Sequence, residues 1–111
     1  MIALKVLDEA ALQIADQSIY YEEHASLALA HRWEAAVEAA IGSLRNFPER
    51  GERLAVKSAA LADLRKLHIK KFPKHLILYR FDAARQMVLI VSVLHGARDI
   101  DFFLQINPFN P

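Results

Sequence analysis

The chain has 111 residues, of which 54% are hydrophobic and 24% charged, with only 3 Gly, 4 Pro and no cysteine. These values exclude a disordered chain, a disulfide-stapled fold and thiolate chemistry, and we expect one domain spanning residues 1–111. The most apolar run, MVLIVSVL from Met87 to Leu94, is far too short to cross a bilayer. The N-terminal sequence lacks the basic region and apolar stretch of a secretory signal, so we expect a cytoplasmic protein.

The net charge of +1 is unevenly distributed along the chain. Residues 1–50 hold four Lys/Arg against eight Asp/Glu, a net charge of −4, whereas residues 51–111 hold ten against five, a net charge of +5. An acidic half followed by a basic half indicates a surface made for an anionic partner, either nucleic acid or an acidic protein segment.

The first half of the chain predicts a short strand and two helices. Residues 2–7 (IALKVL) form the strand, which stops at Asp8, a suitable N-cap for a helix that runs to about residue 23. Leu12, Ala15 and Ile19 recur at helical spacing in this helix. Ser26 can cap the second helix, which ends before Pro48. The apolar stripe of the second helix consists of Leu29, Trp33, Ala36, Val37, Ala40, Ile41 and Leu44.

The second half predicts a loop and three strands. Residues 48–61 carry Pro, Gly and charge and indicate a loop. Leu64–Phe72 is the first strand of the three, and Pro73 is expected at the hairpin corner that leads to the second, Lys74–Phe81. The last strand, Met87–His95, is apolar on both faces, so it should be central in the sheet.

The order β-α-α-β-β-β predicts an α+β fold of two layers, with a helical hairpin packed on one face of a small, mainly antiparallel twisted sheet. The other face should remain uncovered, and Lys66, His68, Lys70 and Arg80 are expected to point there. Two interpretations of the basic strand LRKLHIKK stay open. It is either a solvated edge whose lysines prevent aggregation, or a platform that contacts phosphates or carboxylates.

The motifs of common cofactor and nucleophile sites are missing. The five histidines lack metal-ligand spacing and the three glycines are isolated, so we expect neither metal nor cofactor. Ser92, His95 and Asp99 formally offer a nucleophilic triad, but Ser92 lies in a strand without the elbow that would expose its hydroxyl. In VLHGARD (93–99), Arg98 either pairs at the strand exit, with Asp99 capping a short turn, or contacts an anion.

The tract LRKLHIKKFPKHLILYRFD, followed by MVLIVSVLHGARD, resembles the RelE/ParE superfamily of toxins from type II toxin–antitoxin systems. The pair Tyr20–Tyr21 and the segment LRNFPERG (44–51) agree with it, so the resemblance covers nearly the whole chain. It implies a small toxin that a cognate antitoxin wraps and neutralises. It also implies one of two activities, which are inhibition of DNA gyrase in ParE-like members and ribosome-dependent mRNA cleavage in RelE-like members.

The C-terminal tail favours the ParE-like, plasmid-stabilisation branch. RelE-like nucleases usually carry a Tyr, His or Arg near the C-terminus, but after Arg98 this chain reads DIDFFLQINPFNP, which offers no proton-transferring group of that kind. We therefore expect a non-enzymatic toxin that binds gyrase, with an mRNA endoribonuclease as the alternative. If the chain were a ribonuclease, the resemblance would point to His95, Arg98 and Lys70 as catalytic. The expected partner-binding residues are Lys66, His68, Lys70, Arg80 and Arg98.

Overall fold

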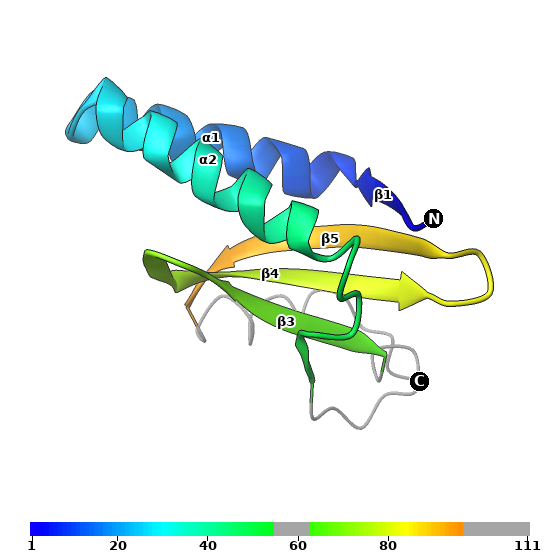
Figure 1. The fold of residues 1–111 in the computed structure, drawn as a ribbon. Helices are drawn as coiled ribbons and strands as arrows, with labels where there is room; N and C mark the ends of the chain where they lie inside the picture. Colours follow the sequence, from blue (N-terminus) through cyan, green and yellow to red (C-terminus); the bar gives the residue numbers. More distant parts are fainter. Residues whose placement is uncertain (55–62, 97–111) are drawn as a thin grey trace.

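The computed structural model describes residues 1–54 and 63–96. Both helices lie on the same side of the sheet, so the predicted α+β fold with two layers is confirmed (Figure 1). No helix in these two ranges is long and apolar enough to cross a membrane. The elements are β1 (Ala3–Val6), α1 (Asp8–His24), α2 (Leu27–Ser43), β2 (Glu52–Arg53), β3 (Leu64–Ile69), β4 (Phe72–Asp82) and β5 (Met87–His95).

The sheet has the strand order β1-β5-β4-β3-β2. Strand β1 pairs parallel with β5, from Ala3 opposite Met87 to Val6 opposite Ile90, and the other neighbours are antiparallel. The mainly antiparallel sheet and the interior position of Met87–His95 are therefore confirmed. Strand β2 was not predicted, because two charged residues in a loop-like sequence carry no apolar alternation.

The hairpin between β3 and β4 turns two residues earlier than predicted. Its corner is Lys70–Lys71, where Lys71 has a φ of 74°, and Pro73 is the second residue of β4. The placement of Pro73 at the corner was therefore wrong. A proline near the beginning of a strand is tolerated because few ladder bonds need its missing N–H.

The two helices begin in different ways. Asp8 is the first residue of α1 and not its N-cap, contrary to the prediction. The cap is Leu7, whose N–H donates to the Ile90 carbonyl, so strand pairing passes directly into the helix. Ser26 does cap α2 as predicted, since its hydroxyl oxygen accepts the Leu29 N–H at 3.0 Å.

Helix α1 does not bury the residues whose spacing suggested an apolar face. Leu12 is 64% exposed and Ile19 51% exposed, whereas Ala10 and Ser18 are buried. Polar contacts fix this orientation: the Trp33 indole N–H donates to the Ile14 carbonyl, and Ser18 donates to the Glu34 carboxylate at 2.6 Å. Helix α1 therefore presents Ala10, Ile14 and Tyr21 to the core and leaves Leu12 and Ile19 at the surface.

The core between the helices and the sheet is built around Trp33 and Tyr79, both fully buried. The stripe of α2 contributes Trp33, Val37 and Leu44 as predicted. The sheet contributes Leu67, Ile69, Ile77, Tyr79, Val88, Ile90 and Val93. Burial of this apolar surface is the main force that holds the hairpin on the sheet.

The opposite face of the sheet is not the uncovered basic surface that the sequence suggested. Leu64, Leu76, Leu78 and Leu94 form a second buried cluster there, with exposures between 0 and 9%. The strand register places Leu78 opposite Lys66 and Leu76 opposite His68, so basic and apolar side chains share this face. The prediction of an open basic face was wrong, because leucines occupy much of this face and their side chains are buried.

Candidate partner-binding site

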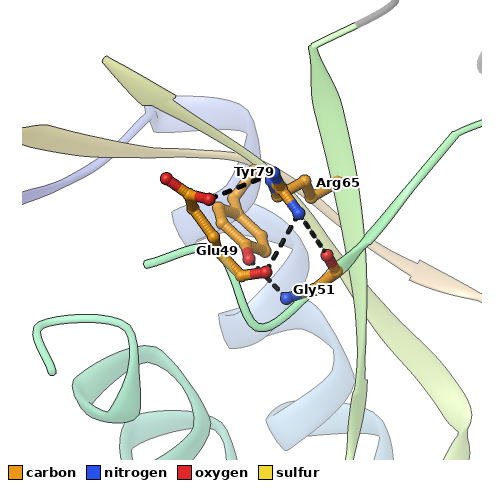
Figure 2. Close-up of polar contacts among 4 residues, drawn as sticks. All are labelled: Glu49, Gly51, Arg65 and Tyr79. Carbon is orange, nitrogen blue, oxygen red and sulfur yellow. Dashed lines mark hydrogen bonds and ion pairs between the residues drawn. The ribbon is translucent and has the colours of Figure 1, made fainter. Parts of the chain in front are cut away.

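An arginine fixes the segment that follows α2 against the sheet. The Arg65 guanidinium donates to the carbonyl oxygens of Glu49 at 2.9 Å and Gly51 at 2.8 Å, and it lies 3.9 Å from the Glu49 carboxylate (Figure 2). The buried Tyr79 hydroxyl accepts the Gly51 N–H at 2.7 Å (Figure 2). Glu49 and Gly51 are thereby fixed against the sheet, and Arg50, which lies between them, is held in position as well.

A groove of about 650 Å³ lies between α2 and the β3–β4 hairpin. One face of α2 lines this groove, and four alanines recur on it at helical spacing. Their small side chains leave space between the α2 backbone and the hairpin. The apolar lining residues are Leu29, Ala35, Ala36, Ala39, Ala40, Leu67 and Phe72.

Basic side chains from three separate segments surround this groove, and no Asp or Glu is among its described lining residues. The basic lining residues are Arg32, Arg50, His68, Lys70 and Lys71. Arg50 donates to the Ser43 hydroxyl at 2.9 Å. Within residues 1–54 and 63–96, Arg32, Lys70 and Lys71 form no ion pair. The groove is therefore an apolar channel with positive edges, a suitable environment for an anionic and partly apolar ligand.

The predicted partner-binding residues do not form one surface. Lys66 and Arg80 share the face of the leucine cluster, where Lys66 lies 3.7 Å from Glu52 and Arg80 binds Asp63 at 3.0 Å. Lys70, at the hairpin corner, lines the groove, and so does His68, although the strand register places His68 opposite Leu76 of the leucine cluster. Arg98 lies outside the described residues, as does the predicted C-terminal turn that Asp99 would cap.

His95, the residue considered for nuclease chemistry, lies at the same end of the sheet as the β3–β4 hairpin but is not among the described lining residues of the groove. It pairs across the strands with the buried His75, and the two rings are 4.8 Å apart at their centroids. Both line a second cavity of about 280 Å³, together with Asp16 and Tyr20 of α1. This second cavity therefore brings together two imidazoles and a carboxylate. Side chains of these kinds can donate and accept protons near neutral pH, so they are the candidate groups for acid–base chemistry in the described part of the chain.

Aromatic rings line both cavities and pack against one another. His75 lies 4.6 Å from the Trp33 ring, and Trp33 meets Phe72 edge-to-face at 5.3 Å. Tyr21 packs on the same rings, and burial raises the pKa of its phenol, so it stays neutral at physiological pH. These rings are packing elements, and the part of the chain that the structure describes has no cluster of three His, Cys, Asp or Glu that could hold a metal ion.

Sequence reasoning missed the groove residues Arg32, Arg50 and Lys71, as well as Arg65. The first three lie in three separate segments, and only the fold brings them to one rim. The sequence did indicate the α2 side of the groove, since Ala35, Ala36, Ala39 and Ala40 form a stripe of small residues at helical spacing. Arg65 lies on the opposite face of β3 from its neighbour Lys66, and the several N–H groups of its guanidinium let it bind both carbonyl oxygens.

Solved structures share this fold. The chromosomal ParDE toxin–antitoxin system from P. aeruginosa is similar at a TM-score of 0.70 and 14% identity, covering 86% of this chain and 97% of that one. The RelBE2 complex from Mycobacterium tuberculosis gives 0.58 and 23%, covering 85% and 96%. The isolated E. coli RelE toxin gives 0.57 and 10%, covering 99% and 100%. Identities this low show the fold alone.

The family is shown by sequence. Comparison with curated protein sequences gives no match. A family model described as the ParE toxin of the type II toxin–antitoxin system parDE matches residues 4–100, which is most of the chain and includes both helices and all five strands except Ala3 of β1. The chain therefore belongs to the ParE toxin family of type II toxin–antitoxin systems.

Proposed function

We propose that this toxin inhibits DNA gyrase by direct binding, without cutting RNA, in a plasmid-stabilisation-like module of the bacterial cytoplasm. A cognate antitoxin neutralises it. The observation that supports this choice is the separation of the candidate nuclease residues. Lys66 and Arg80 are ion-paired on the leucine face, Lys70 lines the groove, and His95 lies beside His75 in the second cavity.

Cleavage of RNA by its own 2′-hydroxyl needs a base, an acid and a cation around a single phosphate. In the described residues these groups are distributed over three places. Beyond Arg98 the sequence offers no Tyr, His, Lys or Arg that would complete the set. Binding to a large enzyme makes no such demand, since it requires only a complementary surface.

The second candidate is an mRNA endoribonuclease, and the His75–His95 cavity is the observation that favours it. The two histidines, Asp16 and Tyr20 could divide the roles of acid and base between them. This arrangement would work through His95, because His75 is only 5% exposed.

Two assays on the purified toxin decide between these functions. We expect inhibition of supercoiling by gyrase and no cleavage of ribosome-bound mRNA. His95→Ala and Arg98→Ala are made in parallel, with His31→Ala, at an exposed position of α2, as the control. Codon-positioned mRNA cleavage that disappears in His95→Ala or Arg98→Ala, but persists in His31→Ala, would overturn the proposal and establish the ribonuclease.

A further inference from the structure

We propose that the isolated toxin associates with itself head to tail, with the outer face of α1 from one copy seated in the groove between α2 and the β3–β4 hairpin of a second copy. Nothing in this contact depends on the target that the toxin inhibits. Three features of the chain support it, which are the chemistry of the outer face of α1, its match to the groove, and the positions of the two surfaces on opposite sides of α2.

The outer face of α1 is an apolar stripe bordered by carboxylates. Leu12 and Ile19 are seven residues apart and therefore lie on one side of the helix, where they are 64% and 51% exposed. The helix carries no Lys or Arg. Within residues 1–54 and 63–96, none of its carboxylates forms an ion pair. Its acidic residues are Asp8, Glu9, Asp16, Glu22 and Glu23. Helix α1 thus presents the acidic, amphipathic surface of a helix that docks in a groove.

The dimensions of the two surfaces agree. The α2 side of the groove runs from Leu29 to Ala40, and the outer face of α1 runs from Leu12 to Glu23. Each corresponds to about 16 Å of helix, or about three turns. Helices approach more closely where the side chains between them are small, and the alanine stripe of α2 provides such a surface. The apolar stripe of a second copy can therefore enter the groove.

The charges of the two surfaces are opposite. Arg32 of α2 and Lys70 and Lys71 of the hairpin corner line the groove, and no Asp or Glu is among its described lining residues. These three cations form no ion pair in the part of the chain that the structure describes, so docking does not first require breaking one. The carboxylates beside the apolar stripe of α1 supply the missing anions. Such complementarity orients the two surfaces and speeds their association.

The two surfaces of one chain cannot meet each other. Glu34 accepts a hydrogen bond from Ser18 of α1, so this side of α2 faces α1. Arg32 is two residues away from Glu34 and points to the opposite side of α2, because each residue of a helix is rotated by about 100° from the last. The helices lie side by side on the sheet, with the groove on the flank of α2 away from α1 (Figure 1). Only another copy can bring α1 to the groove.

A contact between two different surfaces repeats from copy to copy and builds an open chain or a ring. The first test follows the mass of the full-chain toxin by analytical ultracentrifugation between about 1 and about 200 µM. This range is suitable because three turns of helix bury less than a standard interface of ~1,600 Å² and should give a micromolar dissociation constant. At low salt we expect the average mass to rise steadily above the 12.6 kDa of one chain. In about 0.5 M NaCl the rise should need about tenfold more protein, since salt screens the charges.

The second test blocks each surface separately. Ala39→Trp fills the groove, and Leu12→Lys/Ile19→Lys places two cations on the outer face of α1. All three residues are exposed, so both variants should fold normally, which circular dichroism and thermal unfolding check. Each variant alone should stay monomeric. A mixture of the two should form a dimer and nothing larger, because it retains one intact groove and one intact α1 face.

Matched controls place the same side chains elsewhere. His31→Trp lies on α2 outside the groove, and Leu27→Lys/Phe47→Lys replaces two exposed apolar residues outside α1 with the same change in net charge. Both controls should associate like the wild type. Their agreement with the wild type would show that neither a new tryptophan nor two added cations by themselves prevent association.

Several outcomes would overturn the proposal. A wild type that stays monomeric over the whole range excludes self-association. Association that persists in Ala39→Trp assigns the contact to another surface, and association that persists in Leu12→Lys/Ile19→Lys assigns the groove to another part of the second copy. Two monomeric variants that do not dimerise when mixed exclude the head-to-tail arrangement. A monomeric wild type that binds an oligonucleotide, with binding lost in Ala39→Trp and kept in His31→Trp, would assign the groove to nucleic acid.

Discussion

The contact between Gly51 and Tyr79 shows how closely a single side chain can approach the backbone. A Cβ added at Gly51 would lie 2.6 Å from the phenol ring of Tyr79, which is fully buried and cannot move away. The same closeness allows the Gly51 N–H to reach the Tyr79 oxygen at 2.7 Å. The absence of a side chain at Gly51 is therefore a requirement of packing.

This geometry predicts opposite effects for two glycine substitutions. Gly51→Ala should lower the free energy of unfolding by about 1–3 kcal/mol, the usual cost of overpacking. Gly42, within α2, has no atom within 4 Å of an added Cβ, so Gly42→Ala should raise it by about 0.5–1 kcal/mol through helix propensity. Urea unfolding measures both values. Equal stability of the two variants would show that residue 51 tolerates a side chain.

The buried phenol of Tyr79 also predicts a dependence of stability on pH. Burial raises the pKa of Tyr79 above its ordinary value of 10.0, and the hydrogen bond from Gly51 and the nearby Arg65 only partly offset this. The unfolded tyrosine therefore ionises at a lower pH than the folded one. The contribution of this group is fully present below pH 10 and is lost as the pH rises through the folded pKa.

Unfolding measured in denaturant between pH 8 and 11.5 tests this dependence. Tyr79→Phe should be less stable than the wild type at pH 8, because the Gly51 N–H loses its partner, but its stability should decline less steeply above pH 10. Tyr20→Phe, which removes an exposed hydroxyl, should keep the wild-type slope. Parallel declines in wild type and Tyr79→Phe would exclude Tyr79 as the group responsible.

At the scale of the elements, α1 is attached to the sheet through an irregularity of β5. Leu78 pairs with Ser92 and Tyr79 with Ile90, so Val91 is an extra residue that forms a bulge. The Gln13 side-chain oxygen accepts the Val93 N–H at 2.6 Å and the Ser92 hydroxyl at 2.9 Å. One side chain of α1 thus satisfies the donors beside the bulge.

Gln13→Ala should therefore destabilise the protein although it removes no apolar contact. We expect a loss of about 1–3 kcal/mol in the free energy of unfolding, since the Val93 donor is left without its partner. Leu12→Ala removes a larger apolar side chain one residue away, but Leu12 is 64% exposed, so the change should stay within about 0.5 kcal/mol. The reverse ranking in chemical denaturation would show that α1 is held by its apolar stripe.

The same contacts explain which elements could be predicted from sequence. Strand β5 is apolar on both faces and α2 carries a continuous stripe with a Ser26 cap, so local patterns were sufficient for both. The orientation of α1 depends on Gln13 meeting Ser92, which is 79 residues away. A short stretch of sequence around Gln13 therefore gives no indication of this hydrogen bond. The groove was missed for a similar reason, because Arg32 and Lys71 line one groove only after the helical hairpin packs on the sheet.

At the scale of the whole molecule, the sheet buries side chains on both faces. Ile77 belongs to the core beneath the helices, and its neighbour Leu78 belongs to the leucine cluster on the opposite face. Both are 0% exposed. Alternation along β4 therefore sends successive side chains into two separate cores, a pattern expected of a strand that is covered on both sides.

A pair of truncations tests whether the second core contributes as much as the first. We expect Ile77→Ala and Leu78→Ala each to lower the free energy of unfolding by about 2–5 kcal/mol, because each removes fully buried methyl groups and leaves a cavity. Val6→Ala, at a site 38% exposed, serves as the control and should cost far less. If Leu78→Ala behaved like Val6→Ala, the leucine face would be a solvent-facing surface in solution. Lys66 and Arg80 would then lie on an open sheet face, and that face would compete with the groove as the docking surface.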